Sequence, residues 1–188
     1  MKVYLASSSP RRREILGNLG VEITVVKPEA DESSSVTEPG ALTELLARRT
    51  AEAVADECGD GLVIACDTVV CAGGEILGKP ASREEAVSMF RALSGGAHTV
   101  VSGICLMMGG RCVTAHEVTE VIFDELSDRD IENCITLDNP YDKAGGYAVQ
   151  GMASLYIKGL RGDYFNVVGL PVHLLNRTLK ENFGIELI

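Results

Sequence analysis

Residues 62–70 read Leu62-Val63-Ile64-Ala65-Cys66-Asp67-Thr68-Val69-Val70, a nearly continuous apolar run with several β-branched side chains. Such a run predicts a strand that is covered on both faces, as strands are in the sheets of α/β proteins. One carboxylate, that of Asp67, interrupts the run, and a carboxylate is costly to bury unless another group pairs with it. This stretch therefore indicates the fold class and also contains the first candidate functional residue.

Asp67 is open to two interpretations. Open α/β sheets bind their ligands at the carboxyl ends of strands, which is near the expected position of Asp67. There a carboxylate could accept a proton from water or hold a metal ion. The alternative is an aspartate that accepts backbone N–H bonds at the end of a strand, which is common in any fold.

Strands and helices alternate on both sides of this run. Strands are predicted at residues 3–6, 21–26, 62–70, 99–108 and 111–123, and helices at about residues 10–18, 41–58, 82–93, 127–136 and 171–183. A further short strand is expected within residues 142–162, and Gly109-Gly110 predicts a hairpin between residues 99–108 and 111–123. The alternation predicts an α/β fold with a mixed sheet.

The composition excludes several classes of protein. The 188 residues include 17 Lys and Arg against 27 Asp and Glu, a formal net charge of −10, which argues against a general DNA or RNA coat. No apolar run approaches the roughly 18 residues of a membrane span, and the first residues lack the apolar core of a signal peptide. Since the six cysteines include no C-x-x-C pair, we expect reduced thiols in a cytoplasmic protein with no nucleic-acid or membrane partner.

A cluster of arginines follows the first predicted strand. In residues 7–13, Ser-Ser-Ser-Pro-Arg-Arg-Arg, the pair Ser9-Pro10 provides an N-cap and a first helical residue. Three arginines conflict with the positive end of the helix dipole, unless a phosphate binds between the backbone amides and the guanidinium groups. We expect Arg11 or Arg12 to bind such an anion and Arg13 to lie on a solvated basic face.

Two further segments combine glycines with a lysine, namely Gly78-Lys79-Pro80 and the loop of residues 142–151. In the loop, glycines allow close approach of the backbone to a ligand, Lys143 supplies a positive charge, and Gln150 offers both a donor and an acceptor. Lysines beside glycine turns are also ordinary surface features. Together with the arginines and Asp67, however, these groups supply the cations and the carboxylate that phosphoryl transfer requires.

These segments, in this order, resemble the Maf family of nucleoside triphosphate pyrophosphatases, over nearly the whole chain. The matching segments are residues 5–12, 31–32, 66–70, 78–80, 98–103, 142–151 and 162–171. The resemblance implies a Maf/ITPase-like α/β fold with a mixed twisted sheet, flanking helices and two lobes around a deep cleft. We expect residues 1–188 to form this single domain.

The resemblance also implies a reaction. A nucleoside triphosphate would be cleaved between its α- and β-phosphates, with a divalent metal ion, Mg²⁺ or Mn²⁺, to give the monophosphate and pyrophosphate. Asp67 matches the family's proposed proton acceptor and is, with Glu32, a candidate metal ligand, since Mg²⁺ favours one or two carboxylates plus substrate phosphates. A homodimer is carried over from the resemblance as well. The residues expected to bind the substrate are Ser7, Arg11, Arg12, Thr68, Lys79, Lys143 and Gln150.

Within the family, the stretch that ends in Gln150 resembles the subgroup that acts on dTTP and UTP. On that analogy Arg11, Thr68 and Gln150 match the positions associated with substrate choice. The Gln150 amide could pair with the N3–H group and an adjacent carbonyl of uracil or thymine, and a site built on such bonds rejects bases that lack them. The alternative is that Gln150 merely closes the loop.

One position departs from the family pattern. In residues 46–51, Leu-Ala-Arg-Arg-Thr-Ala, the family usually has lysine where this chain has Thr50. That lysine is expected to reach the phosphates; Arg49 could substitute, but one helical position turns a side chain by about 100°. The departure keeps open a weakly catalytic nucleotide-binding regulator of cell division. A pyrophosphatase for a modified nucleotide is a further alternative.

Overall fold

The computed structural model describes residues 1–188, which divide into two compact units. The first unit comprises Met1–Asp67, Ser102–Glu117 and Gly169–Ile188, and the second comprises Thr68–Val101 and Val118–Val168. Three strands contribute residues to both units: β3 (Leu62–Ala72), β5 (Ala97–Met108) and β6 (Arg111–Phe123). None of the helices combines the length and the apolar character that crossing a bilayer requires.

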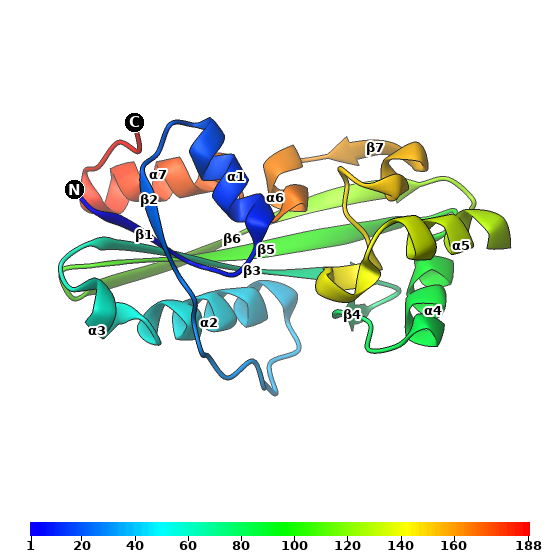
Figure 1. Cartoon of the computed structure of the whole chain (residues 1–188), viewed down its shortest axis with the longest axis horizontal. Helices are drawn as coiled ribbons and strands as arrows, with labels where there is room; N and C mark the ends of the chain where they lie inside the picture. Colours follow the sequence, from blue (N-terminus) through cyan, green and yellow to red (C-terminus); the bar gives the residue numbers. More distant parts are fainter. The chain divides into compact units, whose positions relative to one another are not determined.

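Each of the remaining elements lies within one unit (Figure 1). The first unit holds β1 (Val3–Ala6), α1 (Pro10–Asn18), β2 (Ile23–Val26), α2 (Pro39–Glu52), α3 (Ala55–Cys58) and α7 (Val172–Phe183). The second unit holds β4 (Glu75–Leu77), α4 (Arg83–Leu93), α5 (Asp128–Leu137), β7 (Ile157–Arg161) and α6 (Tyr164–Val168). It also holds three short 3-10 helices, η1 (Pro140–Asp142), η2 (Ala144–Gly146) and η3 (Met152–Leu155).

The strands form a seven-stranded mixed sheet, as the sequence predicts. They hydrogen-bond in the order β2-β1-β3-β5-β6-β7, with β4 paired to β3. Strand β1 is parallel to both β2 and β3, whereas β4 is antiparallel to β3 and β7 is antiparallel to β6. The register of β1 on β3 places Ala6 beside Ala65. Because both strands run in the same direction, Ser7 and Cys66 follow at the same edge.

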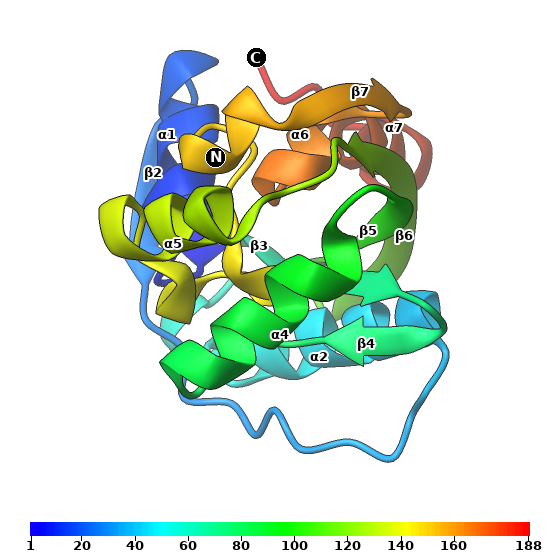
Figure 2. The same cartoon turned by 90° about the vertical axis from the view of Figure 1, so that its right-hand side faces the viewer.

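In the first unit, helices cover both faces of the strands. Figure 1 shows α2 and α3 on one side of β1 and β3, and α1 and α7 on the other; Figure 2 gives a second view of α1, α2 and α7. Small side chains bring α2 close to the sheet, since Ala47 and Ala51 are fully buried and pack in a cluster with Ala65. Gly103 allows the closest approach, because a Cβ atom there would overlap the backbone of Thr43. The apolar run of β3 is therefore covered on both faces, as expected.

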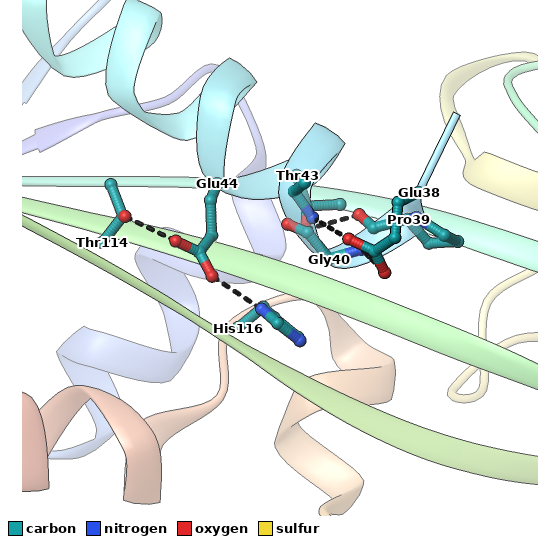
Figure 3. Close-up of polar contacts among 8 residues, drawn as sticks. Glu38, Pro39, Gly40, Thr43, Glu44, Thr114 and His116 are labelled. Atoms are coloured by element: carbon teal, nitrogen blue, oxygen red, sulfur yellow. Dashed lines mark hydrogen bonds and ion pairs between the residues drawn. The ribbon is translucent and has the colours of Figure 1, made fainter. Parts of the chain in front are cut away.

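The N-terminus of α2 is fixed by a polar cluster (Figure 3). The carboxylate of Glu38 caps the helix by accepting bonds from the amides of Gly40 and Ala41, at 3.0 and 2.5 Å. One turn later, Glu44 accepts a hydrogen bond of 2.5 Å from Thr114 Oγ1, and its other oxygen lies 2.6 Å from Nδ1 of His116. The helix is thereby joined to the first half of β6.

In the second unit, α4 packs against α5, and both contribute to a separate apolar core. That core is built around Phe90 and Phe123, which are 1% exposed, and around the ring of Tyr147. Helix α5 is capped by Ser127, and Asp130 completes the capping box. The second unit thus buries its own apolar surface.

Two element predictions differ from the structure. The helix predicted over residues 41–58 is divided into α2 and α3 at Val54, whose φ of −117° and ψ of 0° end the regular helical path. The strand predicted over residues 62–70 continues to Ala72 and turns back as β4. The turn residues Gly73 and Gly74 have φ values of 60° and 84°, which glycine adopts without strain.

Candidate functional site

The loop between β1 and α1 is organised by Ser7 and Arg12. Ser7 is 5% exposed, and its Oγ accepts hydrogen bonds from the amide of Ser9 at 3.1 Å and from Nη1 of Arg12 at 3.3 Å. The Nε atom of Arg12 donates a bond of 2.8 Å to the carbonyl of Gly169. Two bonds to protein acceptors fix the plane of the guanidinium group, so this cation has a defined orientation beside the start of α1.

The first turn of α1 is arranged as the sequence predicts, with one exception. Ser9 occupies the N-cap position and Pro10 the first helical position, but the Ser9 hydroxyl makes no capping bond. Arg11 is half-buried and Arg13 is exposed, in agreement with the expected solvated position of Arg13. The helix has no acidic residue in its first turn, so its positive end is not neutralised from within the helix.

Asp67 lies where β3 passes from the first unit to the second. The burial pattern of β3 shows Asp67 and Thr68 as two half-buried residues within an otherwise buried stretch. The preceding residue, Cys66, is 3% exposed, and its thiol donates to the carbonyl of Gly169 at 3.2 Å. Cys66 is therefore a buried packing residue, while Asp67 remains accessible in part.

The carbonyl of Gly169 connects the loop between β1 and α1 to the segment of β3 that carries Asp67. The oxygen of Gly169 accepts from both Arg12 Nε and Cys66 Sγ. The structure thus brings the arginine of α1 and the strand segment that carries Asp67 to the same point, just before α7. Neither the apolar pattern nor the spacing of these residues predicts the role of Gly169, although it lies in a segment that the resemblance includes.

Glu32 lies in the loop that leads to α2, and its side chain is exposed. The neighbouring Asp31 carboxylate accepts bonds from the amide and the hydroxyl of Ser33, at 2.9 and 2.8 Å. These two bonds, with a smaller contribution from the charge of Arg49, lower the pKa of Asp31. The loop around Glu32 is therefore a closed turn, held in part by its own side chains.

Few side chains of the chain are candidate ligands for a metal ion. Among the described residues, no group of three His, Cys, Asp or Glu side chains comes together as a metal cage. The two expected ligands, Glu32 and Asp67, are an exposed and a half-buried carboxylate of the first unit. Such oxygen donors fit Mg²⁺ or Mn²⁺, which take one or two carboxylates and complete their coordination with water and substrate phosphates.

In the second unit, Lys143 is buried at 8% exposure and has three partners. Its ammonium group lies 2.8 Å from Asp142 Oδ1 and 3.4 Å from Asp138 Oδ1, and it also donates to the carbonyl of Asn139. An ammonium group has three donors. A direct phosphate contact, which the sequence suggests, would require Lys143 to give up one of these partners.

The glycine-rich loop is joined to the turn that carries Lys79. The amide of Gly145 donates a bond of 2.9 Å to the carbonyl of Gly78. Gly145 has a φ of 66°, and a Cβ atom there would lie about 3.0 Å from the side chain of Val70. The Lys79 side chain is exposed, as is that of Gln150 at the other end of the loop.

The candidate residues therefore form two groups. Ser7, Arg11, Arg12, Glu32 and Asp67 belong to the first unit, and Thr68, Lys79, Lys143 and Gln150 belong to the second. The structure brings Ser7 and Arg12 into contact, and it connects the backbone beside Lys79 to the loop that Lys143 organises.

The buried pair of His98 and Tyr147 is not predicted from the sequence. Nε2 of His98 lies 2.7 Å from the hydroxyl of Tyr147, and both rings pack edge-on against Phe123. Burial lowers the pKa of His98 from 6.5 to about 4 and raises that of Tyr147. Two features of the sequence could have indicated this pair: His98 stands at the start of an apolar strand, and Tyr147 follows two glycines.

Comparison with known proteins gives consistent results over the whole chain. Residues 2–182 match the model of the Maf family, described as Maf-like protein. The chain is 47% identical to the dTTP/UTP pyrophosphatase of Desulforamulus reducens, covering 99% of this chain and 98% of that protein. It is 46% identical to the dTTP/UTP pyrophosphatase of Pelotomaculum thermopropionicum (100% and 99% covered) and 45% identical to that of Thermococcus onnurineus (97% and 99% covered).

Among solved structures, the Staphylococcus aureus Ham1 protein matches with a TM-score of 0.43 and 13% identity, covering 65% of this chain and 72% of that one. Since both the family model and relatives of more than 40% identity cover nearly all residues, the chain belongs to the Maf family.

Proposed function

We propose that this protein is a nucleotide pyrophosphatase that hydrolyses dTTP and UTP between the α- and β-phosphates, releasing the nucleoside monophosphate and pyrophosphate. The observation that carries the proposal is the 45–47% identity, over 97–100% of the chain, with relatives named dTTP/UTP pyrophosphatase. The geometry of the first unit supports it, because the chain presents an oriented guanidinium group and a partly accessible carboxylate.

The phosphates are assigned to the start of α1. Arg12 is held in one plane by Ser7 and Gly169, and Arg11 is half-buried on the same turn. Guanidinium groups bind phosphate oxygens through paired N–H donors, and the positive end of the helix dipole adds to that attraction. These residues would neutralise the triphosphate and orient the α-phosphorus for attack.

Asp67 is assigned to the proton of the attacking water. As the water oxygen bonds to the α-phosphorus, the bond to the oxygen bridging the α- and β-phosphates breaks and pyrophosphate leaves. The carboxylate of Asp67 accepts the proton that the water releases. A divalent metal ion held by Glu32 and Asp67 would supply neutralising charge to the phosphate oxygens.

The second unit is assigned to the base and to the departing group. Lys79, which is exposed, would meet the pyrophosphate, and Lys143 would support the same end through the loop that it anchors. Gln150 and the hydroxyl of Thr68 would recognise uracil or thymine by hydrogen bonding. Those bonds reject other bases because the polar groups of the site would then be left unpaired.

A cytoplasmic location and a homodimer are part of this proposal. The location is inferred from the sequence, and the homodimer is inferred from the family resemblance alone. The dimer is testable by multi-angle light scattering of the purified chain. A mass near twice 20.0 kDa is the expected result, and a mass near 20.0 kDa would remove the dimer from the proposal without affecting the reaction.

A second candidate function is kept open by the threonine at position 50, where the family resemblance leads us to expect a lysine. A nucleotide-binding regulator with little turnover would bind dTTP or UTP tightly and release almost no pyrophosphate. A third candidate keeps the reaction but uses a modified nucleotide as the substrate.

One experiment separates these candidates. Pyrophosphate release is measured with Mg²⁺ for dTTP, UTP, CTP, dCTP, ATP, GTP and a set of base-modified nucleotides. The leading proposal predicts the highest kcat/KM for dTTP and UTP. Binding without release for every nucleotide and metal supports the regulator, whereas release only from a modified nucleotide supports the third candidate.

A further inference from the structure

Arg49, close to the end of α2, is half-buried and points to the loop that carries Glu32. Its Nη1 atom donates hydrogen bonds to the carbonyl of Ser33 at 2.6 Å and to the carbonyl of Asp31 at 3.3 Å. These two carbonyls lie immediately before and after Glu32. The guanidinium group therefore binds the backbone on both sides of that residue while the Glu32 side chain stays exposed.

The same turn is closed from its other side by Asp31. Its carboxylate accepts bonds from the amide and the hydroxyl of Ser33, at 2.9 and 2.8 Å. Residues 31–33 are thus held by a side-chain turn and by a cation from a neighbouring helix. A loop fixed in this way presents Glu32 at a defined position relative to α2.

We propose that Arg49 is a positioning residue that holds Glu32 ready to bind the divalent cation of the pyrophosphatase reaction. This inference rests on the proposed function. It also assigns Arg49 a different role from that of the family lysine, because its guanidinium group is already directed to the loop backbone. At the next position, Thr50 has a short uncharged side chain.

The chain contains a matched control on the same helix. Arg48 precedes Arg49 but is exposed, and its Nε atom binds Glu52 at 2.7 Å, one turn along the helix. An exposed pair of this kind contributes little to stability. Replacing Arg48 removes the same charge from the same helix without touching the Glu32 loop.

The test compares Arg49→Gln, Arg49→Lys and Arg48→Gln with the unaltered chain. Mn²⁺ binding is measured by titration calorimetry without nucleotide, which gives a readout independent of turnover. Arg49→Gln is expected to weaken Mn²⁺ binding about tenfold, since bonds to a charged donor are lost. Arg49→Lys is expected to recover part of the affinity, because an ammonium group retains the charge with fewer matching donors. Arg48→Gln should change affinity less than twofold.

Two further measurements identify the cause. Amide exchange in residues 31–36 should accelerate in Arg49→Gln, showing that the loop is released. In the pyrophosphate-release assay, the Mg²⁺ concentration that gives the half-maximal rate should rise by the same factor as the Kd for Mn²⁺. The KM for UTP and the kcat at saturating Mg²⁺ should stay within about twofold, because Arg49 does not touch the nucleotide.

Several results would overturn this proposal. Unchanged Mn²⁺ affinity in Arg49→Gln would mean that Arg49 does not serve Glu32. A raised KM for UTP at saturating Mg²⁺ would mean that Arg49 binds the nucleotide itself, and absence of Mn²⁺ binding by the unaltered chain would mean that no cation site is preformed. If the chain binds Mn²⁺ with the expected dependence on Arg49 but hydrolyses no nucleotide, the reaction fails and the cation site stands.

Discussion

Nε of Arg12 donates a hydrogen bond of 2.8 Å to the carbonyl oxygen of Gly169, which joins the first turn of α1 to the segment before α7. The residues are separated by 157 positions in the chain. Since the same carbonyl accepts the thiol of Cys66, a single backbone group sets the distance between an arginine and the strand that carries Asp67. The reaction that we propose needs that distance to be fixed.

The first prediction concerns Arg12. Replacing it by lysine keeps the charge but removes the planar group that binds both Ser7 and Gly169, so the orientation of the cation is lost. We expect kcat/KM for UTP to fall about 100-fold and the free energy of unfolding to fall by about 1–2 kcal/mol. Arg13→Lys, at an exposed position on the same helix, should change neither value appreciably. Equal effects of the two replacements would contradict the role of Arg12.

A second prediction concerns pH and the buried pair His98 and Tyr147. The pKa of His98 is about 4 in the folded chain against 6.5 in its ordinary state, because burial disfavours the charged ring. Between these pH values the unfolded chain binds more protons, so the folded state loses stability as pH falls from about 6.5 toward 4. The loss reaches on the order of 3 kcal/mol near pH 4.

Urea unfolding from pH 7.5 to 4.5 tests this prediction. His98→Gln lacks the titrating group and should show a smaller fall in stability over that range, although it is less stable at pH 7.5. His173→Gln, at an exposed position, should follow the unaltered chain. An identical pH slope for the unaltered chain and His98→Gln would show that His98 does not titrate in this way.

A third prediction concerns the contact between Gly40 and His116 (Figure 3). A Cβ atom at Gly40 would lie 2.6 Å from the imidazole ring, and Glu44 holds that ring in place. Gly40→Ala should therefore lower the free energy of unfolding by about 1–3 kcal/mol, even though alanine favours helices.

The matched control is Gly17→Ala in α1, where no atom lies within 4 Å of the added Cβ. There alanine should stabilise the chain by up to about 1 kcal/mol. In a chain that already carries His116→Ala, adding Gly40→Ala should cost little further stability, because the imidazole ring is gone. Additive losses would mean that the imidazole is not the cause.

A fourth prediction concerns Gln150. If its amide recognises uracil and thymine, Gln150→Ala should reduce the preference for UTP over CTP by about 10- to 100-fold. The kcat on UTP should change less than this ratio, because the base is far from the reacting phosphorus. Relative kcat/KM values from mixed-substrate competition give the preference directly. An unchanged preference would support the alternative that Gln150 merely closes the loop.

Most helices and strands can be predicted from local sequence patterns. The contacts that organise the candidate site cannot. Ser9-Pro10 predicts the start of α1 because the fixed φ of proline suits the first helical position, which is a local property of the chain. The break at Val54 is not predicted, because the apolar spacing continues through it. Strand β4 is not predicted either, although Gly73-Gly74 is a hairpin signal.

The sequence indicates candidate site residues by their residue type, but it does not indicate which groups they contact. The charge of Lys143 is evident from the sequence, but its carboxylate partners, Asp138 and Asp142, are apparent only in the folded loop. The sequence suggests Arg49 as a replacement for the lysine expected at position 50, whereas its partners in the structure are the carbonyls before and after Glu32. Long-range hydrogen bonds to backbone carbonyls leave no trace in the pattern of residue types, so the bond from Arg12 to Gly169 could not be predicted either.

The most direct test of the central claim is hydrolysis of UTP in ¹⁸O-labelled water, with the products analysed by mass spectrometry. Attack of water on the α-phosphorus predicts UMP that carries the label and unlabelled pyrophosphate, with the rate lowered at least 100-fold in Asp67→Asn. Label in pyrophosphate or in inorganic phosphate, or a full rate in Asp67→Asn, would contradict the account.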